Sequence, residues 1–208
     1  MNKGLLISFE GTDGSGKTTQ IKLLSEYMHS KGLNHITLRE PGGVAISEEI
    51  RSIVLDNRYK EMDQVTEMLL YAAARAQLVS QVIQPSLASG KSVICDRFVD
   101  SSYIYQGYAR GLGIELVKTV NDVATRNLMP DITFFMDIDP VLALKRRFDN
   151  SQPDRLEAEG TAFQKKVYEG YIKLAGLYPD RIKIISGIHG IDAAFSQIKS
   201  YVDVLLCR

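Results

Sequence analysis

Eight residues near the start of the chain, GTDGSGKT (11–18), combine three glycines with a lysine and a threonine. The spacing fits GxxxxGK(S/T), in which small residues leave backbone N–H groups free to surround phosphate oxygens. In this pattern the ammonium of Lys17 reaches the β- and γ-phosphates, and the hydroxyl of Thr18 contacts Mg²⁺. The stretch therefore predicts a nucleotide phosphate site formed by Gly11, Thr12, Asp13, Gly14, Ser15, Gly16, Lys17 and Thr18.

A carboxylate that suits the same metal ion ends an apolar run further along the chain. SVICD (92–96) finishes with Asp96. A carboxylate in this position helps to hold Mg²⁺, directly or through water, in nucleotide enzymes with such a loop. The sequence therefore predicts a metal site formed by Thr18 and Asp96.

Basic residues that suit a second anion follow. Arg97 comes directly after the apolar run, Arg51 lies in a predicted helix, and the run KRR (145–147) with Arg155 flanks a polar segment. A charge run is more often a solvated helix face. Beside a phosphate loop, however, these residues favour a phosphotransferase, because a second phosphorylated substrate needs positive charge.

Five predicted strands alternate with helices and place these residues. The strands cover 4–10, 35–39, 91–96, 131–138 and 181–186. A long helix is expected over 62–88, with an apolar stripe of Val65, Leu69, Ala72, Ala76, Val79 and Ile83. The polar segment 149–160 has no apolar period and is expected to be a mobile loop. The alternation predicts an α/β fold with a five-stranded parallel sheet flanked by helices, whose ligands bind at the carboxyl ends of the strands.

Composition limits the compartment and the partners. The 208 residues carry no formal net charge, which gives no indication of a nucleic acid polymer or an anionic membrane as partner. No apolar stretch approaches the roughly 20 residues of a membrane span, and GLLISFEG is too short for a signal peptide. Cys95 and Cys207 lack metal-type spacing. Two such cysteines indicate a reducing cytoplasm rather than a disulfide framework.

Several classes of nucleotide-binding protein contain such a phosphate loop. A GTPase would need a base-reading motif of the NKxD kind, which the chain lacks. A deoxynucleoside kinase would need a carboxylate base, for which Asp13 or Glu40 qualifies. A nucleotide-binding regulatory module would not need basic residues around a second site. The phosphotransferase interpretation accounts for most of these features.

Six segments together resemble the thymidylate kinase family. They are EGTDGSGKTT (10–19), REPGG (39–43), AAARAQL (72–78), DRFVDSSYIYQGYARG (96–111), PD (130–131) and DRLE (154–157), in the order of the family's signatures. The resemblance implies a single P-loop kinase domain over 1–208 of the nucleoside monophosphate kinase type, with a lid at about 149–160. It also implies phosphoryl transfer from ATP to dTMP with Mg²⁺, in dTTP synthesis, by a cytoplasmic homodimer. The alternatives are a deoxynucleoside kinase or another pyrimidine nucleoside monophosphate kinase.

The resemblance also implies roles for individual residues. Residues 11–18 would hold the ATP phosphates. Asp13 is similar to the family's loop carboxylate, which contacts the 3′-hydroxyl of the acceptor sugar and the arginines around the acceptor phosphate. Tyr71 stands where an aromatic ring, often phenylalanine, stacks on thymine, and Arg75 resembles the donor to the base carbonyl. The rest of the acceptor site would comprise Glu40, Arg51, Arg97, Ser101, Ser102, Tyr105 and Gln106.

Catalytic charge is expected from both substrate sites. No arginine or lysine occupies the variable positions of the phosphate loop. Members of the family with such a loop supply a catalytic arginine from the lid, which points to Arg147 and Arg155 and less clearly to Arg146. Lys17, Asp13 and Arg97 complete the expected catalytic set.

Overall fold

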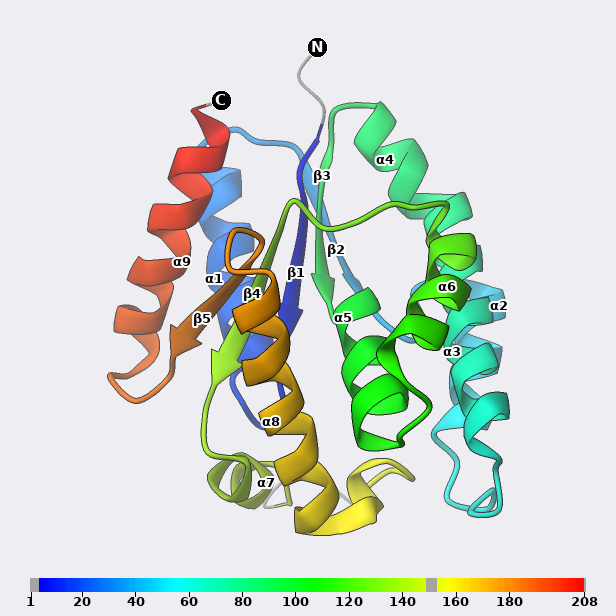
Figure 1. Cartoon of the computed structure of the whole chain (residues 1–208). Helices are drawn as coiled ribbons and strands as arrows, with labels where there is room; N and C mark the ends of the chain where they lie inside the picture. Colours follow the sequence, from blue (N-terminus) through cyan, green and yellow to red (C-terminus); the bar gives the residue numbers. More distant parts are fainter. Residues whose placement is uncertain (1–3, 149–152, 208) are drawn as a thin grey trace.

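Five parallel strands form the centre of the molecule (Figure 1). The computed structural model describes residues 4–148 and 153–207. The strands are β1 (Leu6–Glu10), β2 (His35–Arg39), β3 (Ser92–Asp96), β4 (Ile132–Asp137) and β5 (Ile182–Ser186), and their order in the sheet is β2-β3-β1-β4-β5. Each lies within a predicted strand or matches it, so the predicted parallel α/β sheet is confirmed.

Helices cover both faces of the sheet because side chains alternate between the faces along each strand. Ile7 and Phe9 of β1 pack against α1 (Lys17–Ser30) and α9 (Ile191–Leu206). Leu6 points to the opposite face, where α3 (Gln64–Leu78), α6 (Ile114–Thr125) and α8 (Gly160–Leu177) lie. The polar side chains Ser8 and Glu10 are fully buried. Their burial marks the region where the core gives way to a polar site.

Shorter helical elements complete the chain. They are α2 (Ala45–Val54), the π-helix η1 (Val79–Ile83), α4 (Gln84–Ala88), α5 (Val99–Ser102), the π-helix η2 (Tyr103–Ala109), α7 (Pro140–Phe148) and the 3₁₀ turn η3 (Glu157–Glu159). The long predicted helix 62–88 is thus divided by η1. It begins after Asp63, whose carboxylate accepts from the N–H groups of Val65 and Thr66 as an N-cap.

One local prediction was wrong. The first turn of α3 does not bury the predicted apolar stripe. Val65 and Leu69 are 42% and 51% exposed, whereas Glu67 is 1% exposed. The inward face of α3 meets polar groups of η2, and this contact overrides the apolar pattern.

The segment between α7 and α8 is more ordered than a simple loop. Residues 153–160 include the turn η3, and the carboxylate of Asp154 accepts from the N–H groups of Leu156 and Glu157. Residues 149–152, the start of the predicted lid, lie outside the described residues. In the described ranges 4–148 and 153–207, no helix is both long and apolar enough to cross a membrane.

Candidate active site

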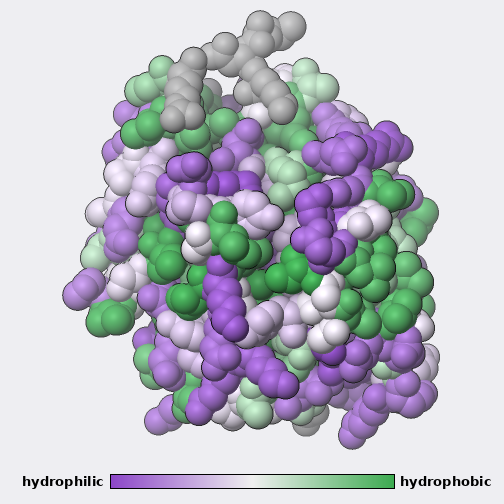
Figure 2. Space-filling view, viewed as in Figure 1, coloured by the Kyte–Doolittle hydropathy of each residue, from purple (hydrophilic) through white to green (hydrophobic). Residues whose placement is uncertain are grey.

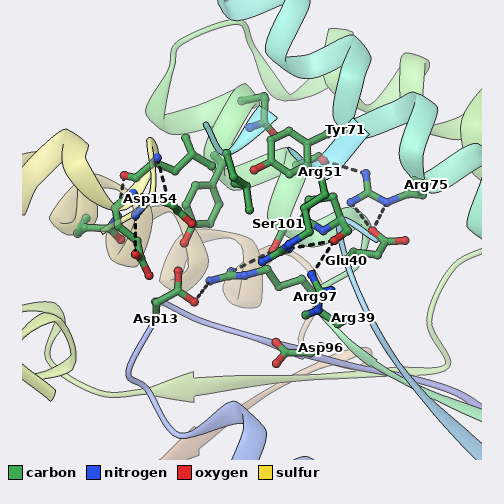
Figure 3. Close-up of a pocket in the computed structure, with 18 of the residues that line it drawn as sticks. Asp13, Arg39, Glu40, Arg51, Tyr71, Arg75, Asp96, Arg97, Ser101 and Asp154 are labelled. Atoms are coloured by element: carbon green, nitrogen blue, oxygen red, sulfur yellow. Dashed lines mark hydrogen bonds and ion pairs between the residues drawn. The ribbon is translucent and has the colours of Figure 1, made fainter. Parts of the chain in front are cut away.

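A pocket opens at the carboxyl ends of β1, β2 and β3 (Figure 3). Parallel strands bring their carboxyl ends to one edge, so residues distant in sequence meet there. The pocket is lined by twelve of the residues that the sequence predicted for the site or the lid: Asp13, Glu40, Arg51, Tyr71, Arg75, Asp96, Arg97, Ser101, Ser102, Tyr105, Gln106 and Arg147. Five arginines are among the lining residues when Arg39 is included. This charge suits phosphorylated ligands.

The phosphate loop lies beside this pocket, between β1 and α1. Gly14 has a φ of +81°, and a Cβ there would lie 2.0 Å from the carbonyl oxygen of Ala143. Only glycine fits, which accounts for the small residue in the pattern. The Lys17 ammonium is 3.1 Å from the carbonyl oxygens of both Gly11 and Thr12. The Ser15 hydroxyl is buried without a hydrogen-bond partner in the described part of the chain.

Burial changes the pKa of the loop lysine, Lys17. Burial, together with the nearby Arg97 charge, lowers the pKa of Lys17 below its ordinary value. A neighbouring anion opposes this effect, since Asp13 lies 3.4 Å from the Lys17 ammonium. A bound polyphosphate would act in the same direction as Asp13 and favour the charged ammonium.

Asp13 and Arg97 form the boundary between loop and pocket. The Arg97 guanidinium donates to Asp13 at 2.8 Å, and the two side chains face each other in Figure 3. Burial alone would raise the pKa of Asp13, but the charges of Arg97 and Lys17 outweigh it and hold that pKa well below its ordinary value. Asp13 is therefore an anion between two cations, on the side of the loop that lines the pocket.

The backbone of Arg97 is held in an uncommon conformation. Its φ is +71°, in the left-handed region that disfavours residues other than glycine. The next N–H, of Phe98, donates to the buried carboxylate of Glu10 at 2.7 Å. Glu10 also accepts from the hydroxyls of Ser101 and Tyr171. These bonds fix the turn that points Arg97 at Asp13.

Arg75 has every N–H donor occupied. Its Nε and Nη2 lie 2.7 Å and 2.6 Å from the same oxygen of Glu40. Its Nη1 donates to Ser102 and Asn121 at 2.8 Å and 2.5 Å, and its Nη2 donates to the carbonyl of Phe98 at 3.1 Å. A base carbonyl can therefore meet Arg75 only by sharing or replacing one of these partners.

Glu40 presents an unused acceptor to the same region. Its Oε1 is buried and has no hydrogen-bond partner in the described residues. Burial raises the pKa of Glu40 to about 7, against the opposing charge of Arg75. The carboxyl is thus positioned beside the pocket at a pKa near neutrality. The peptide bond that follows it, Glu40-Pro41, is cis.

The elements α3, α5 and η2 supply the remaining wall. Tyr71 lies one turn before Arg75 on α3, as the sequence predicted, and both side chains come from this helix in Figure 3. The Tyr105 ring lies 5.2 Å from the Arg97 guanidinium, and its hydroxyl is buried without a partner in the described chain. Gln106 is 1% exposed. An aromatic ring, an arginine and an amide therefore surround one space, as recognition of a planar polar ring requires.

The predicted lid arginines lie in different environments. Arg147 lines the pocket, and its Nε donates to Glu157 at 2.7 Å. Arg155 is only 5% exposed, donates to Glu67 at 2.6 Å and to the carbonyl of Val54 at 2.9 Å, and is not among the lining residues. The second of the predicted arginines is therefore docked against α3 rather than directed at the pocket.

Sequence reasoning assigned no role to seven further lining residues. They are Arg39, Pro41, Leu55, Asp154, Leu156, Glu157 and Gln164. Five of them fall within the segments REPGG and DRLE, so the motif itself was an available signal. Leu55 and Gln164 lie outside both segments, and only the tertiary fold brings them to the pocket.

A phosphate loop that faces an arginine-rich pocket across Asp13 and Arg97 defines a P-loop kinase for small phosphorylated acceptors. The family model described as "Thymidylate kinase" matches residues 9–198. The chain belongs to the thymidylate kinase family. It therefore phosphorylates dTMP to dTDP in dTTP synthesis (EC 2.7.4.9), with ATP as the phosphoryl donor.

Individual relatives agree over nearly the whole chain. The chain is 51% identical to the thymidylate kinase of Caldanaerobacter subterraneus subsp. tengcongensis over 204 residues, which are 98% of this chain and 97% of the relative. It is 46% identical to that of Clostridium novyi, over 97% of this chain and all of the relative. The crystal structure of the Ehrlichia chaffeensis thymidylate kinase superposes with a TM-score of 0.77 at 33% identity, covering 96% and 99% of the two chains.

Proposed function

We propose that the pocket holds dTMP with its phosphate at Arg97 and Arg51, next to ATP phosphates held by residues 11–18. The observation that carries this proposal is the Asp13–Arg97 contact at 2.8 Å, which joins the phosphate loop to the pocket. Arg51 lies on the same pocket, where its Nη1 donates to the carbonyl of Pro41 at 2.9 Å. Both guanidinium groups can thus reach an anion that enters the pocket.

Charge and positioning supply the catalysis. An oxygen of the dTMP phosphate attacks the γ-phosphorus, the bond from this phosphorus to the β-γ bridging oxygen breaks, and ADP leaves. The attacking oxygen is already ionised near neutral pH, so no general base is needed. The main obstacle is the approach of two polyanions, and Lys17, Arg97 and a lid arginine offset their repulsion.

The residues of the predicted metal site fit Mg²⁺. The Thr18 hydroxyl lies 3.5 Å from a carboxylate oxygen of Asp96, so two hard oxygen donors adjoin the phosphate loop. Residues 4–148 and 153–207 hold no cluster of three or more histidine, cysteine or acidic side chains that suits a metal. One carboxylate with substrate phosphates is a usual environment for Mg²⁺. When bound, the ion would neutralise charge on the β- and γ-phosphates.

Base recognition falls to α3 and η2. Tyr71 stacks on thymine, Arg75 donates to the C4 carbonyl in place of its contact with Ser102, and the Gln106 amide meets N3–H. Burial raises the pKa of Tyr71 well above its ordinary value, so its hydroxyl stays neutral. Around the sugar and phosphate of dTMP we place Glu40, Ser101, Ser102 and Tyr105.

The lid role belongs to residues 149–160, within one kinase domain formed by the whole chain. Of the two predicted lid arginines, Arg147 is the better placed to contact the transferring phosphoryl group, because it already lines the pocket. Arg155 would have to leave Glu67 and Val54 before its guanidinium could act on the transferring phosphoryl group. Lid closure would also exclude water and so limit ATP hydrolysis.

We further propose a cytoplasmic homodimer that packs through α2, α3 and α6. These helices carry exposed apolar side chains: Ile46, Ile53, Val65, Leu69, Leu116 and Val123. Figure 2 shows hydrophobic residues on the side where Figure 1 places α3 and α6. Sedimentation of the wild-type chain and of a Val123→Glu variant tests the association. The free thiols of Cys95 and Cys207 suit a reducing compartment.

Measurement of ADP release with each nucleoside monophosphate tests the substrate assignment. We expect dTMP to be the best substrate and dUMP to be weaker, since a methyl group is worth about 1–3 kcal/mol in an apolar pocket. dCMP, purine monophosphates and the nucleoside thymidine should be nearly inert. Efficient turnover of CMP or AMP would overturn the thymine assignment, and efficient turnover of thymidine would favour a nucleoside kinase.

A further inference from the structure

The amide of Gln106 has a fixed orientation in the pocket wall. Gln106 lines the pocket and is 1% exposed. Its Nε2 lies 2.9 Å from Oε1 of Glu67 on α3. An ionised carboxylate only accepts hydrogen bonds, so the NH₂ end of the amide must face Glu67. The carbonyl end of Gln106 is left to serve any ligand in the pocket.

Two arginines keep Glu67 ionised in its buried position. Arg155 donates to its Oε2 at 2.6 Å, and Arg110 donates to the same oxygen at 3.1 Å. Burial alone would raise the pKa of Glu67, but the hydrogen bonds from Gln106 and Arg110 and the arginine charges outweigh it, and the pKa lies below its ordinary value. Glu67 is therefore a permanent acceptor between the lid segment and the base-facing amide.

We propose that Glu67 determines base selection by holding Gln106 with its carbonyl toward the base. This inference rests on the proposed binding of thymine in this pocket. The N3 atom of thymine carries a hydrogen and needs an acceptor, whereas N3 of cytosine is itself an acceptor. A carbonyl held toward N3 pairs with thymine and opposes cytosine, and Glu67 achieves this without touching the substrate.

The substitution Glu67→Gln tests the orientation. The arginines only donate, so the introduced carbonyl turns toward Arg155 and Arg110, and the introduced NH₂ group faces Gln106. The Gln106 amide can then turn over and present its NH₂ group to the base. The ratio of kcat/KM for dTMP to that for dCMP should fall about tenfold or more, with kcat/KM for dCMP rising in absolute terms. The KM for ATP should stay unchanged.

Two further variants test whether Glu67 acts on base selection through Gln106. Glu159→Gln removes a carboxylate that also pairs with Arg110, at 2.6 Å, whereas the Gln106 amide donates to Glu67. It should leave the dTMP to dCMP ratio unchanged. Gln106→Met removes the amide, and adding Glu67→Gln to it should cause no further change in the ratio. An equal effect of Glu67→Gln in both backgrounds would show that Glu67 does not act through Gln106.

The outcomes separate this inference from the proposed function. If the wild-type chain fails to prefer dTMP over dCMP, both are overturned. If it prefers dTMP and Gln106→Met abolishes the preference, but a folded Glu67→Gln variant retains it, only the role of Glu67 is wrong. If the Glu67→Gln variant does not fold, NMR of the wild-type protein tests the inference instead. The Gln106 side-chain NH₂ signal is assigned by comparison with the Gln106→Met variant. Slow hydrogen exchange of this NH₂ group supports the inference, and exchange as fast as that of an exposed amide refutes it.

Discussion

Replacing Arg75 should destabilise the protein strongly and in a pH-dependent way. Arg75→Met keeps much of the side-chain volume but leaves Glu40, which is 4% exposed, without its buried cation. Removing one partner of a buried ion pair costs about 3–5 kcal/mol. For a chain of this size, 1 kcal/mol shifts Tm by about 2–4 °C. We therefore expect Tm to fall by about 6–20 °C near neutral pH.

The pH dependence of this loss follows from the pKa of Glu40. In the wild type this pKa is about 7, raised by burial and restrained by Arg75. Without Arg75 the pKa rises further, so Glu40 stays protonated in the folded variant. As pH rises from 6 to 8.5, Glu40 ionises in the folded wild type but not in the folded variant. The difference in unfolding free energy between the two proteins therefore grows. At 1.36 kcal/mol per pH unit above 7, the difference grows by about 2 kcal/mol.

Urea denaturation at several pH values measures this effect. The double variant Arg75→Met/Glu40→Gln should recover part of the lost stability and lose the pH dependence, because no carboxylate remains unpaired. A Tm decrease below 2 °C, or a loss that does not change between pH 6 and pH 8.5, would refute the assignment of a buried ion pair. In assays below the lowered Tm, dTMP turnover should be impaired while the KM for ATP stays nearly unchanged.

Three other predictions concern the phosphate loop, the lid and pH. Lys17→Met should reduce kcat severely with little change in Tm, and near-normal turnover would remove the phosphate-loop assignment. Arg147→Ala and Arg155→Ala should each lower kcat more than they weaken dTMP binding, by up to about 10³. If steady-state assays place both within a few-fold of wild type, the lid-arginine mechanism is wrong. Glu40→Gln should flatten the pH profile of unfolding. Because folding raises the pKa of Glu40 from 4.5 to about 7, the wild type loses stability as pH rises through this interval, by about 3 kcal/mol relative to the variant. Parallel profiles for the two proteins would contradict this.

The sheet and the phosphate loop could be predicted because their signals are local. A buried parallel strand needs a short apolar run, and a phosphate loop needs glycine wherever a Cβ would collide, as at Gly14. The convergence of Asp13, Asp96 and Arg97 follows from parallel topology alone. Pairing partners such as Glu67 for Arg155 are 88 residues apart and depend on how α3 meets the segment before α8. No local pattern encodes that contact.

The face of α3 shows where periodicity stops being informative. Apolar spacing identified the helix, but Val65 and Leu69 are exposed on it. Glu67, Tyr71 and Arg75 recur every four residues, so they form one stripe along the helix. A charged and aromatic stripe would ordinarily be assigned to solvent. Here Glu67 and Arg75 are almost fully buried, and each has its hydrogen bonds satisfied by residues from other elements. Burial of such a stripe is tolerated because every charge is paired, and it places an aromatic ring between two fixed polar groups. The same arrangement that defeats the helical pattern therefore forms the pocket wall to which we assign base recognition.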